Sequence, residues 1–397
     1  MGLNSTPSAE RLHIGIFGKR NAGKSSLINA ITGQSLAIVS DMKGTTTDPV
    51  SKAMELLPLG PVVIIDTPGL DDEGTLGEMR VQKAYQVLNK TDIALVVIDG
   101  NLGESKEDRA LLARIQEKKI PYLVVVNKTD CVENEKAIKG KEDWLFVSAM
   151  TGEGIQELKE KLGTLIPEQK EKRPLVADLL QPLDFVVLVV PIDSSAPKGR
   201  LILPQQQTIR DILEAKAVSI VVKDTEFKET MEKLPVKPKL VITDSQVFKE
   251  ISDLTPKDVA LTSFSVLFAR YKGNLWEAVR GARAVETLED GDTILIAEGC
   301  THHRQCEDIG TVKIPRWLNA YTKKQIQFEF CSGTEFPADL SKYKMIVHCG
   351  GCTLNEREMK YRIRCSVDQE IPITNYGIFI AYMKGILERS IEPFEKR

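Results

Sequence analysis

Near its amino end the sequence reads GKRNAGKS over residues 18–25. The apolar run at 14–17 predicts a buried strand before this stretch, and residues 26–30 predict a helix after it. The glycines let backbone N–H groups face phosphate, and the helix N-terminus adds the positive end of its dipole. Lys24 is then placed to bridge the β and γ phosphates of a nucleotide, and Ser25 to ligate Mg²⁺. Together these features predict a phosphate-binding loop.

Two more motifs follow predicted strands. DTPG at 66–69 comes after the apolar run 62–65, which places Asp66 at the carboxyl end of a strand as an outer-shell Mg²⁺ ligand. NKTD at 127–130 also follows an apolar run. The Asp130 carboxylate can accept hydrogen bonds from guanine N1–H and N2–H, two donors that adenine lacks. The sequence therefore favours GTP over ATP.

With GTTTD at 44–48 and SAM at 148–150, these motifs resemble the GTPases of the TrmE-Era-EngA group over about the first 165 residues. The resemblance implies that Thr46 closes on Mg²⁺ and the γ-phosphate and that the Gly69 N–H meets the γ-phosphate. Met150 stands where this group often carries a lysine. The expected nucleotide-binding residues are Gly18, Asn21, Ala22, Gly23, Lys24, Ser25, Ser26, Thr46, Asp66, Gly69, Asn127, Lys128, Asp130, Ser148 and Ala149.

The group that positions the attacking water is not the usual one. Leu70 follows Gly69, where Ras-like enzymes carry a glutamine. In TrmE-like proteins a downstream switch carboxylate takes this role after G domains pair, and Glu78 or Glu73 fits that place. A solvated switch acid is the other interpretation of either residue. The expected catalytic set is Lys24, Thr46, Gly69 and Glu78.

Asn21 carries a second catalytic expectation. In TrmE-like enzymes this loop position helps to hold K⁺ beside the phosphates, where the cation offsets charge in the transition state. An ordinary loop hydrogen bond is the alternative for Asn21.

Composition limits the partners. The 397 residues, with 53 Lys+Arg against 56 Asp+Glu and a net charge of −3, offer no basic field for nucleic acid or anionic membrane. The longest apolar stretches, such as 185–192, are far shorter than the ~20 residues that span a bilayer. No apolar signal core precedes the first motif, so we expect a cytoplasmic chain with reduced thiols.

The hydrophobic pattern predicts an α/β protein of three domains, a P-loop GTPase domain followed by two further α/β domains with mainly parallel sheets. Buried strands are expected at 185–190, 219–222, 239–243 and 259–262, and then at 293–297, 325–330 and 344–347. The expected divisions are a GTPase domain at 1–166, a charged linker at 167–174, a dimerisation domain at 175–263 and a cluster-binding domain at 264–397.

The cysteines are unevenly placed, because Cys131 stands alone and all others lie between residues 300 and 365. Two groups contain them, CTH at 300–302 and HCGGC at 348–352. Each follows a strand-like run, so in a parallel sheet both open on the carboxyl edge, where α/β folds bind ligands. A helix predicted at 353–363 would favour anionic thiolates at its start.

Two kinds of metal centre fit this spacing. Cys300, Cys349, Cys352 and one histidine would close a tetrahedral zinc site. The same three thiolates would hold an iron–sulfur cubane with one iron left for a weaker or exchangeable ligand. The spacing leaves both open, beside the plainer reading of buried small hydrophobic residues.

Taken together, the TrmE-like G domain, a middle region without recognisable chemistry and the Cys-x-His … His-Cys-x-x-Cys signature resemble the HydF family of [FeFe]-hydrogenase maturation GTPases over nearly the whole chain. The resemblance implies a homodimer joined through the middle domain and a [4Fe–4S] cluster on Cys300, Cys349 and Cys352. It implies a scaffold that receives a di-iron precursor from two radical-SAM maturases, HydE and HydG, and delivers it to apo-[FeFe]-hydrogenase.

The fourth ligand and the function leave alternatives. His302, His348 and Glu307 are the local candidates for the fourth cluster site, while Cys306 and Cys331 lie outside the signature and are interpreted as structural. A tRNA-modifying TrmE-type GTPase would share the G domain but embeds it in a helical domain and ends in a cysteine-bearing tail. A GTP-regulated zinc-binding adaptor is the other alternative, and it would be colourless where an iron–sulfur protein is brown.

Overall fold

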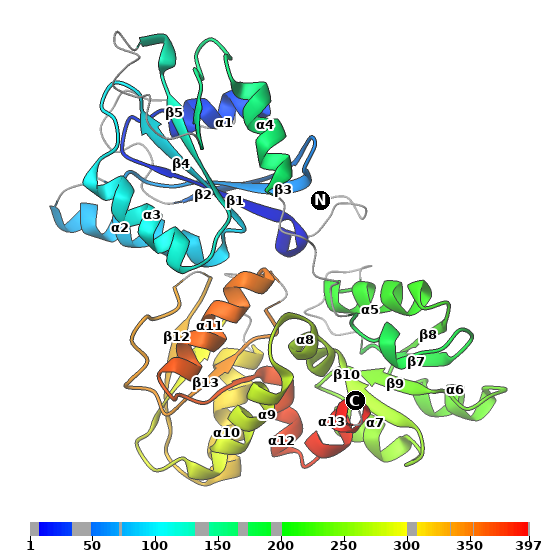
Figure 1. Ribbon diagram of the computed structural model, residues 1–397. Coiled ribbons are helices and arrows are strands. Elements are labelled where there is room, and N and C mark those ends of the chain that lie inside the picture. The colour runs from blue at the N-terminus through cyan, green and yellow to red at the C-terminus, as the bar shows by residue number, and fades with distance from the viewer. Residues whose placement is uncertain are drawn as a thin grey trace. The chain divides into compact units, whose positions relative to one another are not determined.

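A computed structural model describes residues 8–33, 49–70, 74–131, 143–165, 174–191, 201–299, 308–333, 335–351 and 353–395, without the side chains of 74–80. Its contacts divide the chain into two compact units, Met1–Glu171 and Lys172–Arg397 (Figure 1). Each unit is an α/β body, which agrees with the expected fold class.

The first unit is built on a six-stranded sheet in the order β2-β3-β1-β4-β5-β6, in which only the β2–β3 pair is antiparallel. Its strands are β1 (Leu12–Gly18), β2 (Val50–Leu56), β3 (Gly60–Asp66), β4 (Ile93–Asp99), β5 (Tyr122–Asn127) and β6 (Trp144–Phe146). Its α-helices are α1 (Lys24–Thr32), α2 (Gly74–Val87), α3 (Lys106–Glu117) and α4 (Ile155–Thr164).

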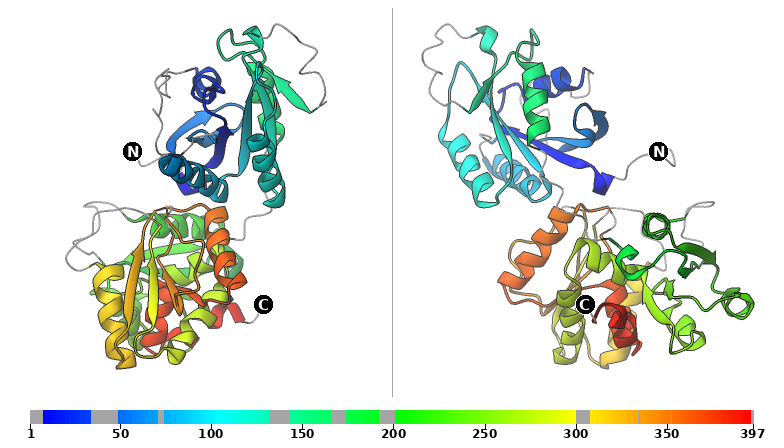
Figure 2. Two further views of the ribbon diagram at one scale, coloured as in Figure 1. Left: turned by 90° about the vertical axis from the view of Figure 1, so that its left-hand side faces the viewer. Right: turned by 45° about the vertical axis from the view of Figure 1, so that its right-hand side comes forward.

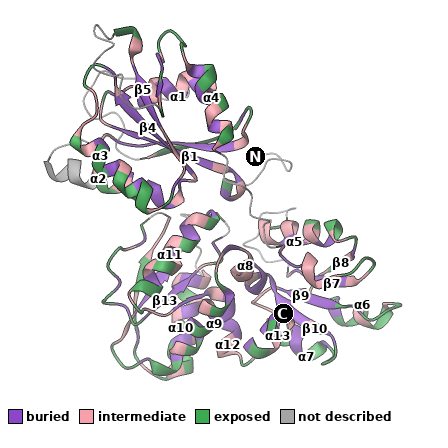
Figure 3. Cartoon of the chain, in the orientation of Figure 1, coloured by how far each residue is buried: buried purple, intermediate pink, exposed green. Residues whose placement is uncertain are grey.

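Helices cover both faces of this sheet, which explains why β4 is apolar without interruption. Alternate β4 residues such as Leu95 and Val97 join the core beneath α1 and α4. The intervening residues, among them Val96, join the core beneath α2 and α3. A strand buried on both faces cannot alternate with polar residues, and the ribbon in Figure 3 is buried along this strand.

The second unit holds two four-stranded sheets with all strands parallel, ordered β10-β9-β7-β8 and β12-β11-β13-β14. The strands are β7 (Phe185–Val189), β8 (Val218–Val222), β9 (Leu240–Thr243), β10 (Ala260–Ser263), β11 (Thr293–Ala297), β12 (Gln327–Cys331), β13 (Met345–His348) and β14 (Ile373–Asn375). The helices are α5 (Leu203–Glu214), α6 (Phe227–Lys233), α7 (Phe248–Leu254), α8 (Phe264–Lys272), α9 (Leu275–Arg283), α10 (Ile314–Thr322), α11 (Glu356–Asp368), α12 (Tyr376–Met383) and α13 (Leu387–Glu395).

One hydrophobic core joins the two sheets of the second unit. It contains Val187 and Leu261 from the first sheet, Val347 from the second, and Phe379 from α12. Helix α13 packs on β10, where the Thr262 hydroxyl donates to the Ser390 carbonyl at 2.9 Å. Figure 2 shows both sheets and their helices from two further directions.

Strands form at all the places predicted in this unit, with ends that differ by a few residues. The predicted division at 263/264 falls between β10 and α8, and the domain limits stay predictions. Among the described residues, no helix has both the length and the apolar character needed to cross a membrane.

Candidate functional site

The phosphate-binding loop begins where β1 ends, and two of its glycines are required by close contacts. Gly18 has φ 149°, and a Cβ there would lie 2.2 Å from the Val97 carbonyl oxygen. Gly23 has φ 87°, and a Cβ there would lie 2.2 Å from Asn127 Nδ2. Side chains at either position would push the loop away from the sheet edge, so the backbone path that faces the phosphates depends on glycine.

Lys24 is buried over this loop. Its Nζ donates to the carbonyls of Gly18 at 3.0 Å and Lys19 at 2.8 Å. The ammonium group therefore lies along the loop backbone, and its role in bridging phosphates stays a prediction.

Ser25 and Asp66 form the candidate magnesium site. The Ser25 hydroxyl donates to Asp66 Oδ2 at 2.8 Å, and Asp66 lies buried at the end of β3. Burial raises the pKa of Asp66, while the Ser25 hydrogen bond and the Lys24 charge oppose the rise. Asp66 Oδ1 is buried without a hydrogen-bond partner among the described residues. An unsatisfied carboxylate oxygen beside a hydroxyl fits Mg²⁺, which prefers oxygen ligands and keeps bound water.

The segment after β3 packs against the phosphate-binding loop. A Cβ on Gly69 would lie 2.9 Å from the Arg20 backbone nitrogen. Thr67 Oγ1 donates to the Ile16 carbonyl at 2.7 Å, and Leu70 is buried in the core beneath α2 and α3. Gly69 thus lies next to the loop, and Leu70 points inward.

Several predicted residues of the first unit lie outside the described part of the chain. These are Thr46, Glu73 and the side chain of Glu78. Asn21 is described, as an exposed residue with φ 59° in the left-handed region, and Ser26 is half-buried in the first turn of α1.

Asn127 ties the guanine motif to the phosphate-binding loop. Its side chain is buried, with Nδ2 donating to the Ala22 carbonyl at 3.1 Å and Oδ1 accepting from the Ala149 N–H at 3.0 Å. Lys128, with φ 68°, pairs through Nζ with Asp99 Oδ2 at 2.7 Å. Three predicted motifs therefore meet at the carboxyl edge of the sheet.

The base-reading carboxylate lies at the same edge. Asp130 is exposed, and its Oδ1 accepts from the Ser148 hydroxyl at 2.6 Å. This hydrogen bond, with a second one from Cys131, lowers the pKa of Asp130. Asp130 therefore stays ionised and can accept two donors. Met150 is 87% exposed.

In the second unit, Cys349 directly follows β13 at the carboxyl edge of its sheet. Its backbone N–H donates to the Ala297 carbonyl of β11 at 2.8 Å. Its Sγ accepts from the Gly299 N–H at 3.0 Å and the Gly351 N–H at 3.4 Å. Backbone donors aimed at sulfur are what a metal-bound thiolate needs to offset its charge, so this residue fits a cluster ligand.

The remaining members of the cysteine signature lie outside the described residues. They are Cys300, His302, Cys306, Glu307 and Cys352. Within the described ranges, no group of three or more His, Cys, Asp or Glu residues could hold a metal ion. Gly299 is the residue directly before Cys300 in the sequence, and its N–H contacts Cys349.

His348, one of the predicted fourth ligands, has both ring nitrogens engaged. Nε2 lies 2.9 Å from Arg362 Nη1, and because arginine can only donate, Nε2 accepts. Nδ1 then carries the proton and donates to the Cys349 carbonyl at 2.6 Å. Burial and the Arg362 charge lower the pKa of His348 to about 3. In this arrangement His348 holds the backbone of Cys349, and neither nitrogen is available to a metal.

Arg362 is fully buried behind this histidine. Its Nε donates to Glu358 Oε1 at 2.9 Å, its Nη2 donates to the Gly333 carbonyl, and its guanidinium lies over the Phe336 ring at 5.1 Å. Neither Arg362 nor Glu358 was predicted from the sequence, because α11 is rich in charged residues and this pattern is typical of a solvated helix.

A second buried pair at this edge was also not predicted. Glu298 follows β11 and is buried, and the Tyr376 hydroxyl donates to its Oε1 at 3.2 Å. Burial, with Glu298 nearby, raises the pKa of Tyr376. At the end of β12, burial raises the pKa of the Cys331 thiol to about 11, and the structural role of Cys331 stays a prediction.

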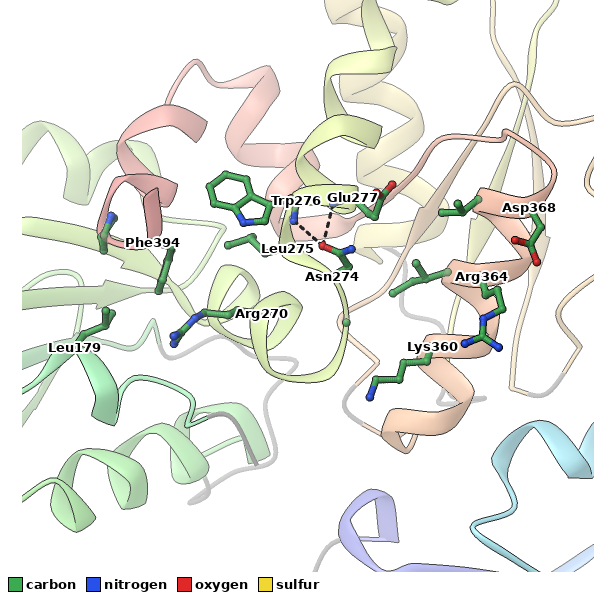
Figure 4. A pocket seen from close by; sticks show the side chains of 14 residues that line it. Leu179, Arg270, Asn274, Leu275, Trp276, Glu277, Lys360, Arg364, Asp368 and Phe394 are labelled. Carbon is green, nitrogen blue, oxygen red and sulfur yellow. Dashed lines mark hydrogen bonds between the residues drawn. The ribbon is translucent and has the colours of Figure 1, made fainter. Parts of the chain in front are cut away.

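A hollow of about 750 Å³ lies elsewhere in the second unit, between the α8–α9 turn, α11 and α13 (Figure 4). Asn274 begins α9 there, with Oδ1 accepting from the N–H groups of Trp276 and Glu277 (dashed lines in Figure 4). The lining mixes cations such as Arg364 with acids such as Asp368, and it contains no predicted site residue.

Comparison with known families accounts for both halves of the second unit. A family model described as the hydrogen maturase F dimerization domain matches residues 175–273, and one described as the hydrogen maturase F tetramerization domain matches residues 276–393. The chain belongs to the hydrogen maturase F (HydF) family. A third model, described as a 50S ribosome-binding GTPase, matches residues 13–128, so this chain carries a GTPase domain.

Curated relatives match the GTPase domain. The tRNA modification GTPase MnmE of Thermotoga maritima is 38% identical over 160 residues, which cover 38% of this chain and 35% of the relative. MnmE of Clostridioides difficile is 34% identical over 163 residues, 40% of this chain and 35% of the relative. The chain thus spans about a third of the length of these relatives.

Two solved structures illustrate the structural similarities. Era of Aquifex aeolicus shares 21% identity at a TM-score of 0.35, covering 55% of this chain and 97% of Era. A probable GTP-binding protein engB shares 24% identity at a TM-score of 0.32, covering 40% of this chain and all of that protein.

Proposed function

We propose that this chain is a GTP-hydrolysing scaffold that binds a [4Fe–4S] cluster through Cys300, Cys349 and Cys352 and delivers a di-iron precursor to apo-[FeFe]-hydrogenase. The observation that carries the proposal is the pair of backbone N–H groups aimed at Cys349 Sγ, one of them from the residue before Cys300. This arrangement occurs in a chain that belongs to the HydF family.

When bound, the cluster supplies an iron with a coordination position at which cargo can be held. The residues of this chain do the rest. The Gly299 and Gly351 N–H groups partly neutralise the Cys349 thiolate, and His348 fixes the backbone that carries it. With His348 engaged, His302 and Glu307 are the remaining candidates for the fourth site. Reduced thiols require a reducing compartment, so the proposal places the chain in the cytoplasm.

Hydrolysis in this proposal depends on charge and position. Lys24 and the loop N–H groups hold the β and γ phosphates, and Ser25 with Asp66 holds Mg²⁺. K⁺ beside Asn21 adds a further positive charge where the transition state gains negative charge. A switch carboxylate, with Glu78 as the candidate, orients the water in place of the glutamine that Leu70 replaces.

The homodimer in this proposal forms through the dimerisation domain. In the described part of the chain β8 pairs with β7 on one side and lies at the edge of its sheet, and its residue Val221 is 43% exposed. An apolar strand edge of this kind pairs readily with a second strand. Light scattering on the full-length chain should show a monomer for Val221→Lys, and a dimer that persists would place the contact elsewhere.

The decisive test is the metal in anaerobically purified protein. We expect a brown protein with four iron and four sulfide per chain and no stoichiometric zinc. The same preparation should hydrolyse GTP in preference to ATP and, after exposure to the maturases HydE and HydG, should activate apo-[FeFe]-hydrogenase. Stoichiometric zinc in a colourless protein would replace this proposal by the zinc-binding adaptor.

A further inference from the structure

Asp99 is an acidic residue at the carboxyl end of β4 that belongs to none of the nucleotide motifs. In the sheet register it lies opposite Asn127, the first residue of the guanine motif. Its Oδ2 accepts from Lys128 Nζ at 2.7 Å, and its Oδ1 accepts from the Asn101 N–H at 2.9 Å. The side chain is 12% exposed. Because both carboxylate oxygens accept a hydrogen bond, Asp99 is a fixed anchor for the Lys128 ammonium group.

The ion pair determines the path of the Lys128 side chain. Lys128 has φ 68°, in the left-handed region that few residues other than glycine adopt. Its Cε lies 3.9 Å from the place that a Cβ on Gly23 would take. The apolar stem of Lys128 therefore passes next to the phosphate-binding loop, and its charged end is held at Asp99.

Lys128 is also close in sequence to the carboxylate that is expected to read the base. Asp130 accepts from the Ser148 hydroxyl through Oδ1 and from the Cys131 thiol through Oδ2. These two hydrogen bonds lower the pKa of Asp130, and the Lys128 charge lowers it further. The two charges therefore already interact. A lysine carries its ammonium group on a flexible four-carbon stem, and such a group on Asp130 would compete with guanine for the carboxylate.

We propose that Asp99 is a positioning residue for base recognition: its ion pair with Lys128 keeps the ammonium group away from Asp130 and leaves that carboxylate to the guanine donors. The inference rests on the proposed function, in which the chain binds GTP and Asp130 reads the base. Guanine presents N1–H and N2–H side by side, whereas hypoxanthine presents N1–H alone. Loss of Asp99 must therefore weaken the binding of a guanine nucleotide more than that of a hypoxanthine nucleotide.

The test compares Asp99→Asn with the native chain. Asparagine has the same shape and keeps an acceptor for Asn101, but it removes the charge that holds Lys128. Glu104→Gln is the matched control, because Glu104 lies in the loop after β4, is 19% exposed and pairs with Arg109 at 3.6 Å. Calorimetry on the full-length proteins with Mg²⁺ gives the affinities for GDP and IDP, which are not hydrolysed. The kcat and KM of GTP hydrolysis are measured on the same preparations.

We expect Asp99→Asn to lower the GDP affinity about fivefold and the preference for GDP over IDP about threefold. The KM for GTP should rise while kcat stays native, since the base makes the same contacts in the ground state and the transition state. Glu104→Gln should keep all these values. A general loss of folded protein cannot imitate the result, because the ratio of two affinities does not depend on the fraction of chain that is folded. An unchanged preference in Asp99→Asn overturns the inference.

A double variant tests the competition itself. Lys128→Met keeps an apolar stem but has no charge, so in the Asp99→Asn background no ammonium group is left to occupy Asp130. The preference for GDP over IDP should then return to the native value, and a preference that stays reduced overturns the inference. Equal native affinities for GDP and IDP, with ADP rejected, overturn it as well. Native protein that binds ADP as tightly as GDP refutes the proposed function instead.

Discussion

Both candidate sites lie at the carboxyl edge of a parallel sheet, but their supporting contacts come from different kinds of residues. At the nucleotide edge the contacts join the motifs to one another, as when Asn127 donates to Ala22. At the cysteine edge Cys349 is supported not only by its own motif but also by residues outside any motif, namely Gly299 and, through His348, Arg362. A sequence motif identifies the candidate ligand residues, whereas the residues that support those ligands are identified only once the fold is known.

The two edges also share a physical property. Each has a buried lysine whose ammonium group contacts backbone carbonyls, Lys24 at the first edge and Lys272 at the second. The proposed occupants differ in how they exchange. In the proposal a nucleotide binds and leaves, while a cluster held by cysteine thiolates stays with the chain.

The largest expected effect separates the two edges by crossed variants. Lys24→Ala removes the phosphate cation and should lower the GTP hydrolysis rate about 10²–10³-fold while iron content stays native. Cys349→Ala removes a charged ligand that water replaces poorly, so iron content should collapse while hydrolysis is retained. Both quantities are measured on both variants.

Cys331→Ala is the control for the cysteine variant. Its thiol is half-buried at the end of β12, which β11 separates from β13, and burial raises its pKa to about 11. We expect full iron in this variant. Loss of iron in Cys331→Ala would make Cys331 a ligand. Loss of both iron and GTP hydrolysis in Lys24→Ala would mean that the two edges are not independent.

The next largest effect compares a buried ion pair, Arg362 with Glu358, with a more exposed one. Arg362→Met leaves Glu358 buried without its cation, which should lower the free energy of unfolding of the second unit by about 3–5 kcal/mol. Urea unfolding followed by circular dichroism measures it. The pair of exposed Arg280 and half-buried Glu277 supplies the comparison, since Arg280→Met should cost no more than about 1 kcal/mol. Equal losses in the two variants would contradict a special role for the buried pair.

A smaller effect concerns the choice of base. Asp130→Asn keeps an acceptor for Ser148 but loses the carboxylate that accepts both guanine donors, so GTP affinity should fall about 10- to 100-fold. The new amide can donate to the oxygen that xanthine carries in place of the guanine amino group. Competition binding should therefore show tighter binding of XTP than of GTP. Unchanged GTP affinity would place base recognition elsewhere.

The smallest expected effect concerns the monovalent cation. Exchange of K⁺ for Na⁺ should slow native hydrolysis by roughly a few-fold, because the ion offsets transition-state charge. Asn21→Ala should remove this difference between the salts, while Ser8→Ala, an exposed change outside the loop, should keep it. Identical native rates in the two salts would leave Asn21 as an ordinary loop residue.

Much of the fold was predictable because parallel strands buried on both faces leave continuous apolar runs. The phosphate-binding loop was predictable for a related reason: its chemistry is local, and Lys24, Gly18 and Gly23 lie within seven positions. His348 shows the limit. Its spacing made it a ligand candidate, but Arg362 occupies its Nε2 from a helix that the sequence pattern presents as solvated.

Lys272 shows the same limit from the opposite direction. A lysine in the last turn of a helix is usually interpreted as a surface residue that complements the helix dipole. Here the Lys272 ammonium group contacts the Gly351 and Leu354 carbonyls, so the side chain turns inward. Only the packing of distant segments reveals this, since Lys272 and Leu354 are 82 positions apart.

The Asn127 side chain has a consequence for ligand discrimination. One amide contacts both the loop that surrounds the phosphates and the segment beside the base. If base binding changes the Ala149 contact and thereby the phosphate affinity, then phosphate binding must change the affinity for the base by the same factor, because thermodynamic linkage is reciprocal. The binding free energies of the base half and the phosphate half of GTP are therefore not additive. The affinity measured for pyrophosphate or guanosine alone underestimates the affinity of the joined molecule.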